Sequence, residues 1–239
     1  MTASLTIIRA KEFVVIAADS CASDALDRQT GKQCKIVQVG EYVYTANKFV
    51  HAPDSGYDLE HIIKDAGAPK SLDAWATGLK QCVYPALIHA LSMQKQQNPN
   101  GFAATFKTRI ALGITLVGIE NGGPSLINLN FLIKDLGVSN VELEIEDHRC
   151  PGADCAAGVA MVLVGDEEFK VRFQQENPDY WVGDVDRIVK NAEHFVQKAI
   201  DENIPGVGLP ISVLVISPSG FDWRKRGLCD TQSPTQHDN

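Results

Sequence analysis

The sequence predicts an α+β protein in which two antiparallel β-sheets pack face to face and helix pairs cover the outer faces, a four-layer αββα sandwich. The main observation is the element order: strand hairpins, two helices, a strand meander, two more helices and a closing hairpin. This order lacks βαβ alternation and so argues against a doubly wound parallel sheet. The length of 239 residues and the apolar content of 44% suit one layered domain. We expect that domain to span residues 1–227, followed by a polar, disordered tail at 228–239.

In the first half of the chain, two hairpins precede two helices. The predicted hairpin strands cover 3–9 and 13–19, then 35–39 and 42–46, with a polar excursion at 20–33 and a loop at 47–57. The helices are predicted at 58–66 and 71–97. Ser71 has the residue type and position of a helix N-cap. Pro85 lies inside the second helix and predicts a kink or break there.

The second half again runs from strands to helices. Residues 109–119 and 124–133 form a predicted hairpin around the turn Asn121-Gly122-Gly123. The segment 140–146 alternates apolar and acidic residues, which indicates a half-buried strand. The remaining predicted elements are a buried strand at 157–164, helices at 166–176 and 184–202, and a closing hairpin with strands at 210–217 and 221–226.

Charge and hydropathy exclude several classes of function. The net charge of -8 argues against nucleic acid as the main partner, because phosphate binding needs a basic face. No apolar run approaches the ~18 residues of a membrane-spanning helix. The N-terminus also lacks the charged, apolar and small-residue regions of a signal peptide. We therefore expect a soluble, cytoplasmic protein with no membrane partner.

The cysteines follow no recognisable framework. In a cytoplasmic chain of this length, their irregular spacing favours free thiols over disulfides. Cys150 and Cys155, with His148 nearby, match zinc patterns poorly, so an ordinary loop is favoured over a metal site. Cys21 is either a reactive thiol or, as we favour, a small apolar filler. We expect no metal and no cofactor. The six cysteines are Cys21, Cys34, Cys82, Cys150, Cys155 and Cys229.

Three residues near the N-terminus carry the candidate chemistry. Thr2 follows Met1 directly, an apolar run ends at Asp19, and Lys35 opens the next apolar strand sixteen residues later. After removal of Met1, Thr2 would carry a hydroxyl nucleophile and, in its α-amine, its own base. The pKa of an α-amine is about 7.7–8.0, so this base is easily neutral near neutral pH. Lys35, if close, would disfavour protonation of that amine, and Asp19 would hold Lys35 charged and oriented.

These residues stand in the order and spacing of a known family. The chain opens with Thr2-Ala3-Ser4-Leu5, continues with Val14-Val15-Ile16-Ala17-Ala18-Asp19-Ser20 and then Lys35, and closes with the hairpin Gly220-Phe221-Asp222-Trp223. Over residues 2–226 it resembles the proteasome β-subunit family of N-terminal nucleophile (Ntn) hydrolases. It looks most like the simple bacterial branch typified by the HslV peptidase, in which only the initiator methionine precedes the threonine. The resemblance implies the Ntn-hydrolase form of the αββα sandwich and catalytic roles for Thr2, Asp19 and Lys35.

The resemblance also implies supporting residues, and here the chain departs from the family. A backbone N–H near Asn47 would stabilise the oxyanion, although the family has a glycine at that place. Asp166 stands where the family has a Gly-Ser-Gly beside the nucleophile. Asp201 keeps the acid of a later motif without its serine, and Cys21 replaces an arginine. These departures concern activity and specificity rather than the fold.

Three functions remain open at this point. The main hypothesis is a threonine-type hydrolase that cleaves amide bonds, chiefly peptide bonds, through an acyl-enzyme on Thr2, assembled as a homo-oligomeric ring or stack. The second is a catalytically silent structural or binding subunit that retains Met1. The third is an Ntn amidase for a small non-peptide amide, because a fold does not fix a substrate. The sequence determines neither the ring size nor whether an ATPase partner exists.

Each member of the trio also has an ordinary alternative. Thr2 also fits a flexible chain end. Asp19 fits the turn that follows a strand, where acids are common. Lys35 fits a surface lysine on an edge strand.

Overall fold

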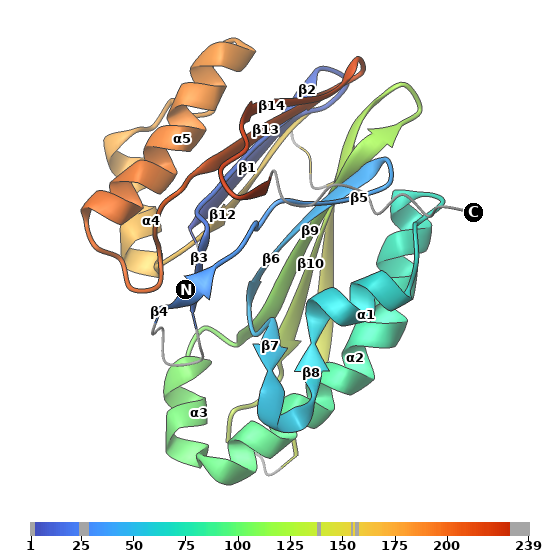
Figure 1. Ribbon diagram of the computed structural model, residues 1–239, viewed down its shortest axis with the longest axis vertical. Coiled ribbons are helices and arrows are strands. Elements are labelled where there is room, and N and C mark those ends of the chain that lie inside the picture. The colour runs from blue at the N-terminus through green and yellow to red at the C-terminus, as the bar shows by residue number, and fades with distance from the viewer. Residues whose placement is uncertain (1–2, 24–28, 138–139, 154, 156–157, 230–239) are drawn as a thin grey trace.

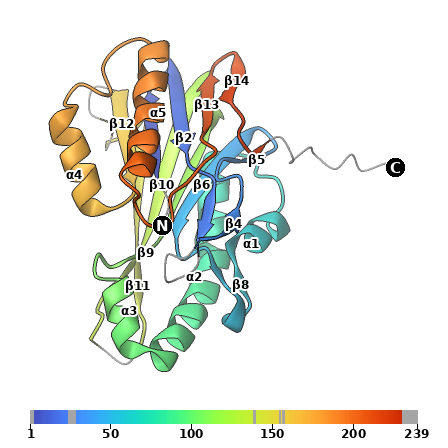
Figure 2. The ribbon, with the colours of Figure 1, turned by 60° about the vertical axis from the view of Figure 1, so that its left-hand side comes forward.

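The computed structural model describes residues 3–23, 29–137, 140–153, 155 and 158–229. Within them, two five-stranded sheets pack face to face, and every strand pairing is antiparallel. Figure 1 shows helices α4 and α5 beyond one sheet and helices α1 and α2 beyond the other, and Figure 2 shows the same arrangement from a second side. The predicted α+β class and αββα layering are confirmed.

The N-terminal and C-terminal strands build the first sheet. Its strand order is β12-β1-β2-β13-β14. The outer face packs on α5, whose apolar stripe includes Ile188, Phe195 and Ala199 and whose N-cap is Asp184. The elements are β1 (Ser4–Arg9), β2 (Phe13–Ala18), β12 (Val159–Val164), α4 (Glu167–Glu176), α5 (Val185–Asp201), β13 (Ser212–Ser217) and β14 (Gly220–Lys225).

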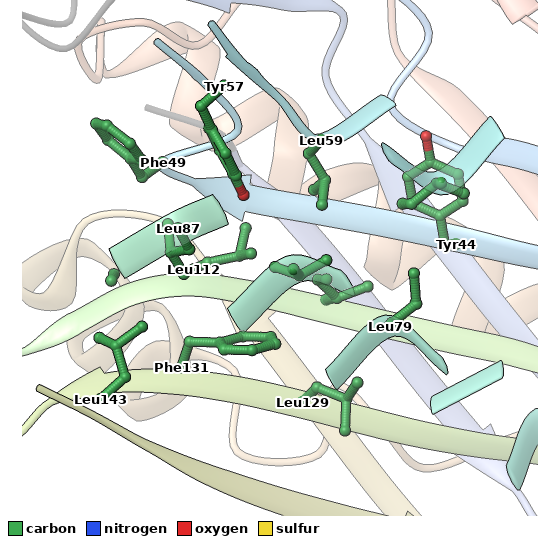
Figure 3. Close-up of a cluster of buried hydrophobic side chains, with 14 of the residues drawn as sticks. Tyr44, Phe49, Tyr57, Leu59, Leu79, Leu87, Leu112, Leu129, Phe131 and Leu143 are labelled. Carbon is green, nitrogen blue, oxygen red and sulfur yellow. The ribbon is translucent and has the colours of Figure 1, made fainter. Parts of the chain in front are cut away.

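The middle of the chain builds the second sheet, with strand order β11-β10-β9-β6-β5. Its outer face packs on α2, and Figure 3 shows Leu79 and Leu87 among the buried side chains of this cluster, with Leu112 and Phe131 from the sheet. The helix continues through Pro85 without the predicted break. The elements are β5 (Val37–Val39), β6 (Tyr42–Lys48), α1 (Leu59–Asp65), α2 (Leu72–Gln97), β9 (Ile110–Glu120), β10 (Gly123–Ile133) and β11 (Leu143–Cys150).

Short elements fill segments that the sequence predicted as irregular. A further short helix, α3, begins after Asn98, whose side chain caps it by accepting a hydrogen bond from the Gly101 N–H. The short elements are β3 (Cys21–Ser23), β4 (Gln29–Lys32), β7 (His51–Ala52), η1 (Pro53–Ser55), β8 (Tyr57–Asp58) and α3 (Pro99–Thr105). The pairs β3–β4 and β7–β8 each form a two-stranded sheet.

The layer between the two sheets is apolar toward one end and polar toward the other. Ile8, Val43 and Val117 belong to the hydrophobic cluster between the two sheets, called here the inner cluster. Successive side chains of a strand point to opposite faces, so every second residue counted from these three also faces this layer. On the same faces the strands carry buried polar residues, and Thr115 Oγ1 donates a 2.9 Å hydrogen bond to Asn128 Oδ1. The buried polar residues of the layer are Ser4, Thr6, Thr45, Asn47, Thr115, Asn128 and Ser212.

Two disulfides correct the prediction of free thiols. Cys34 bonds to Cys229 across a sequence separation of 195, and Cys150 bonds to Cys155. Cys21 and Cys82 stay outside disulfides. Spacing along the chain did not reveal the first pair because only the packing of the two sheets brings its cysteines together. Disulfides are rare in cytosolic proteins, so these bonds count against the predicted cytoplasmic location.

No helix within the described ranges is long and apolar enough to cross a membrane.

Candidate active site

Asp19 is the centre of the candidate site. It follows β2 and is fully buried. Its Oδ1 accepts hydrogen bonds from Lys35 Nζ at 2.8 Å and from the Ala3 N–H at 3.0 Å. Its Oδ2 accepts from the Cys21 N–H at 3.0 Å and from the Gly208 N–H at 3.2 Å. Asp19 therefore bonds locally, as a turn residue does, and also joins three distant segments.

Lys35 reaches Asp19 from the opposite sheet. It precedes β5, an edge strand of the second sheet, whereas Asp19 follows β2 in the first. The side chains in this ion pair are 5% and 0% exposed, so Lys35 is not the surface lysine of the ordinary alternative. Burial lowers the pKa of Lys35, and the Asp19 carboxylate opposes that shift. The pair holds the polar ends of the two sheets together.

The nucleophile proposed from the sequence lies outside the described residues, as does Met1. The first described residue, Ala3, is the covalent neighbour of Thr2 and is fully buried. Its N–H donates to Asp19, and its carbonyl accepts a 3.1 Å hydrogen bond from the Asp19 N–H. The chain is thus fixed against Asp19 from Ala3 onward.

Asn47 lies at the polar end of the inter-sheet layer. It is 9% exposed on β6 and pairs with Gly113 of β9. A Cβ atom at position 113 would lie 2.6 Å from Asn47 Nδ2, so glycine leaves the space that this amide occupies. The predicted oxyanion donor, a backbone N–H near Asn47, belongs to this segment.

The two other supporting acids have local partners. Asp166 is the N-cap of α4 and accepts a 3.0 Å hydrogen bond from the Phe169 N–H. Asp201 is exposed at the end of α5 and accepts from Gln197 Nε2 at 2.8 Å. Asp19 and Lys35 are therefore the two predicted site residues that the described part of the chain brings into contact.

Gly208 is a contact of Asp19 that sequence reasoning missed. Besides its N–H bond to Asp19, its carbonyl accepts from the Ser20 N–H at 3.1 Å. A Cβ atom at position 208 would lie 3.3 Å from Cys21 Cβ, which is a close approach that favours glycine. The glycine follows α5 after several loop residues, and no motif in that loop signals its partner 189 residues away.

Cys21, which lies beside Asp19, is buried, and Cys150 and Cys155 of the loop weighed as a metal site form a disulfide. Cys21 is 2% exposed, and burial raises the pKa of its thiol, with Lys35 opposing the shift. Cys150 and Cys155 are bonded to each other, so the loop that was weighed as a metal site holds a disulfide. Among the residues that the structure describes, no group of three or more His, Cys, Asp or Glu side chains is arranged to hold a metal.

Comparison with known proteins places the fold in a proteasome-like class. The chain is similar to Anbu (ancestral beta-subunit) from Yersinia bercovieri, with a TM-score of 0.55 and 15% identity over 92% of this chain and 86% of that one. It is also similar to an Anbu (Gly-1) mutant from Hyphomicrobium sp. strain MC1, with a TM-score of 0.47 and 12% identity over 93% and 85% of the two chains. No family model and no curated protein matches the sequence.

These neighbours correct the branch named in the sequence analysis. Resemblance to the HslV type is wrong, because the structural likeness is to Anbu from Yersinia bercovieri. The motifs behind it, a strand ending in Ala-Ala-Asp-Ser and a closing Gly-Phe-x-Trp hairpin, follow from strand and turn positions of the fold. They therefore indicate the fold without distinguishing its branches.

Proposed function

We propose that this protein is an N-terminal nucleophile hydrolase that cleaves amide bonds with Thr2 after Met1 has been removed. One observation carries the proposal: a single buried carboxylate, that of Asp19, binds both the Lys35 ammonium and the N–H of Ala3. The proposal requires that the amine and hydroxyl of Thr2, the covalent neighbour of Ala3, act together with Lys35. Perturbed, buried ionisable groups of this kind are typical of functional sites.

The reaction would run in two stages. First, the Thr2 amine takes the hydroxyl proton, the hydroxyl oxygen attacks the substrate carbonyl carbon, and the C–N bond breaks as the leaving amine receives that proton. Water then attacks the resulting ester, releases the carboxylic acid and restores the hydroxyl. Lys35 would stabilise the negative charge that develops on the hydroxyl oxygen and keep the nearby amine neutral. The oxyanion would need backbone N–H donors at the carbonyl, for which the segment around Asn47 is the candidate.

Intact mass measurement with a peptide epoxyketone tests the proposal. This reagent reacts with both the hydroxyl and the free amine of an N-terminal threonine. We expect loss of the Met1 mass and one adduct per chain, with no adduct on the Thr2→Ala variant. Thr2→Ser, which keeps a hydroxyl, is the matched control and should still react. Retained Met1 without an adduct would refute the hydrolase and favour a silent binding subunit.

Substrate class is the next question, and peptides are the first substrates to assay. A protein that forms the adduct but cleaves small amides and leaves peptides intact would be an amidase instead. Turnover of unfolded polypeptides only with an added ATPase would indicate an unfoldase partner.

We infer that the protein acts as a homo-oligomer. Two observations support this inference: the fold neighbour from Yersinia bercovieri is named a beta-subunit, and Met161 stays 38% exposed on the edge strand β12. An apolar edge strand favours contact with another chain. Native mass spectrometry should give a multiple of the 26.0 kDa chain, and a monomer at micromolar concentration would contradict the inference.

A further inference from the structure

Lys35 lies in a part of the chain that the strand ladders do not hold. Strand β4 ends at Lys32 and β5 begins at Val37, so residues 33–36 connect two different sheets. In this segment the Gln33 N–H donates a 2.9 Å hydrogen bond to the Ser20 carbonyl, and Ile36 packs in the inner cluster. A lysine on such a connection needs further constraints to hold its ammonium at one place.

Cys34, the residue before Lys35, supplies such a constraint through its disulfide to Cys229. Cys229 is 8% exposed in the turn that follows β14. That turn is fixed to the first sheet, because Ser212 Oγ donates a 2.9 Å hydrogen bond to the Arg226 carbonyl and lies 3.3 Å from Cys229 Sγ. Gly227 allows this close approach: its φ is +55°, and a Cβ there would lie 2.6 Å from Ser212 Oγ.

Ser212, which holds the turn that carries Cys229, lies beside the end of β2 that leads into Asp19, the ion-pair partner of Lys35. Ser212 of β13 pairs with Ala18 of β2, and Asp19 follows Ala18 directly. Lys35 and Cys34 are therefore consecutive residues that bind to neighbouring points of the first sheet, one through an ion pair and the other through a covalent bond. Together these contacts form a closed ring: Asp19, Lys35, Cys34, Cys229, Ser212 and Ala18.

We propose that the Cys34–Cys229 disulfide positions Lys35 against Asp19, so that Cys34 and Cys229 are positioning residues of the candidate active site. The catalytic consequence rests on the proposed function, whereas the placement of Lys35 does not. Without the covalent bond, residues 33–36 would separate from the first sheet more often, and water would reach the Lys35 ammonium.

The exposure of Lys35 tests the placement without any assay of activity. The Cys34→Ser/Cys229→Ser variant and the wild type are treated with formaldehyde and a mild hydride reductant, and methylation of each lysine is followed by peptide mass spectrometry. We expect the Lys35 rate to rise by roughly tenfold, toward that of the exposed Lys64, which should not change.

Two further variants keep the test specific. The Cys150→Ser/Cys155→Ser variant removes the disulfide that begins on β11, the opposite edge strand of the second sheet, and should leave Lys35 protected. The Cys34→Ala/Cys229→Val variant restores apolar packing without the covalent bond and should expose Lys35. Labelling is done well below each variant's melting midpoint, so that global unfolding does not contribute.

The outcomes separate this inference from the proposed function. Slow Lys35 labelling in both Cys34/Cys229 variants, or a wild-type peptide map without the Cys34–Cys229 crosslink, would overturn the positioning role. If Lys35 becomes exposed but the wild type never reacts with the epoxyketone, positioning holds and the hydrolase fails. If both hold, the Cys34/Cys229 variants should lose kcat with little change in KM, and their pH–rate profile should shift.

Discussion

Lys35 Nζ lies 2.8 Å from Asp19 Oδ1 in a buried pair that joins the two sheets at their polar ends. Asp19 accepts three further hydrogen bonds, all of them from backbone N–H groups, whereas the Lys35 ammonium donates to the Asp19 carboxylate. The two residues should therefore respond differently when their partner is removed.

Breaking this pair from the Asp19 side should destabilise the protein. Asp19→Asn leaves the Lys35 charge buried without a counter-charge, which we expect to lower the free energy of unfolding by about 3–5 kcal/mol. Adding Lys35→Met removes the stranded charge, so the double variant should cost less than the sum of the single ones. Urea unfolding measures all three variants. Strict additivity would mean that the two side chains do not interact energetically.

The pKa of Lys35 predicts a particular pH dependence of stability. Its folded-state pKa is lowered from 10.5 by burial, so between the two values the unfolded state binds more protons. The free energy of unfolding should therefore rise with pH across that window, as the cost of burying the charged ammonium is relieved. Lys35→Met should remove this rise.

Lys64 provides a control, because its pKa is raised in the folded protein whereas the pKa of Lys35 is lowered. Its hydrogen bond to Glu60 raises its pKa, so its contribution is present at lower pH and is lost as pH rises through the folded pKa. Lys64→Met should therefore leave the Lys35-dependent rise in place. Urea titrations from neutral pH up to the ordinary lysine pKa of about 10.4 measure the Lys35 slope, because the Lys64 contribution is lost only above that pH. A wild type whose stability only falls over this range, and a Lys35→Met variant that behaves identically, would contradict the assigned direction.

The two disulfides should differ in their contribution to stability. In the chain-entropy model, a crosslink over a separation of 195 residues restricts the unfolded chain by about 5 kcal/mol, whereas one over 5 residues contributes about 2 kcal/mol. Cys34→Ser/Cys229→Ser should therefore lower the melting temperature more than Cys150→Ser/Cys155→Ser. Scanning calorimetry on the two variants measures the difference, and the reverse order would show that native packing rather than chain entropy dominates.

Periodic segments of this fold were predictable from the sequence, and segments defined by distant contacts were not. The apolar strand β9 and the apolar stripe of α5 lie close to their predicted bounds, whereas the alternating segment predicted at 140–146 forms a strand only from Leu143, which continues to Cys150. The hairpins β3–β4 and β7–β8 have two to four residues per strand, too few for a pattern. The Cys34–Cys229 bond depends on how the sheets pack.

The residues of the candidate site likewise include some that the sequence predicted and others that it did not. Asp19 follows the apolar strand β2 and Lys35 precedes β5, and the expectation that Asp19 would orient Lys35 depended on their being close, as they are in the structure. Gly208 joins Asp19 through its backbone N–H, a group that every residue except proline carries, so the residue type gives no signal of this contact. Asp166 and Asp201 were chosen as acids near family motifs, but one caps a helix and the other is exposed.

The Asn47 side chain, which lies opposite position 113, should leave room only for glycine there. A Cβ at this position would meet the Asn47 amide at 2.6 Å, in a layer closed by both sheets, so Gly113→Ala should cost about 1–3 kcal/mol through overpacking. Asn47→Ala removes the obstructing amide, and in that background Gly113→Ala should be nearly neutral. Urea unfolding of the four proteins in this cycle measures the coupling between the two positions.

A glycine with open surroundings serves as the control for this cycle. Gly78 lies inside α2, and a Cβ there would meet nothing within 4 Å. Gly78→Ala should therefore stabilise the protein by roughly 0.5–1 kcal/mol, because alanine loses less backbone entropy in a helix. If Gly113→Ala costs the same with and without the Asn47 amide, the strand backbone rather than the amide requires glycine.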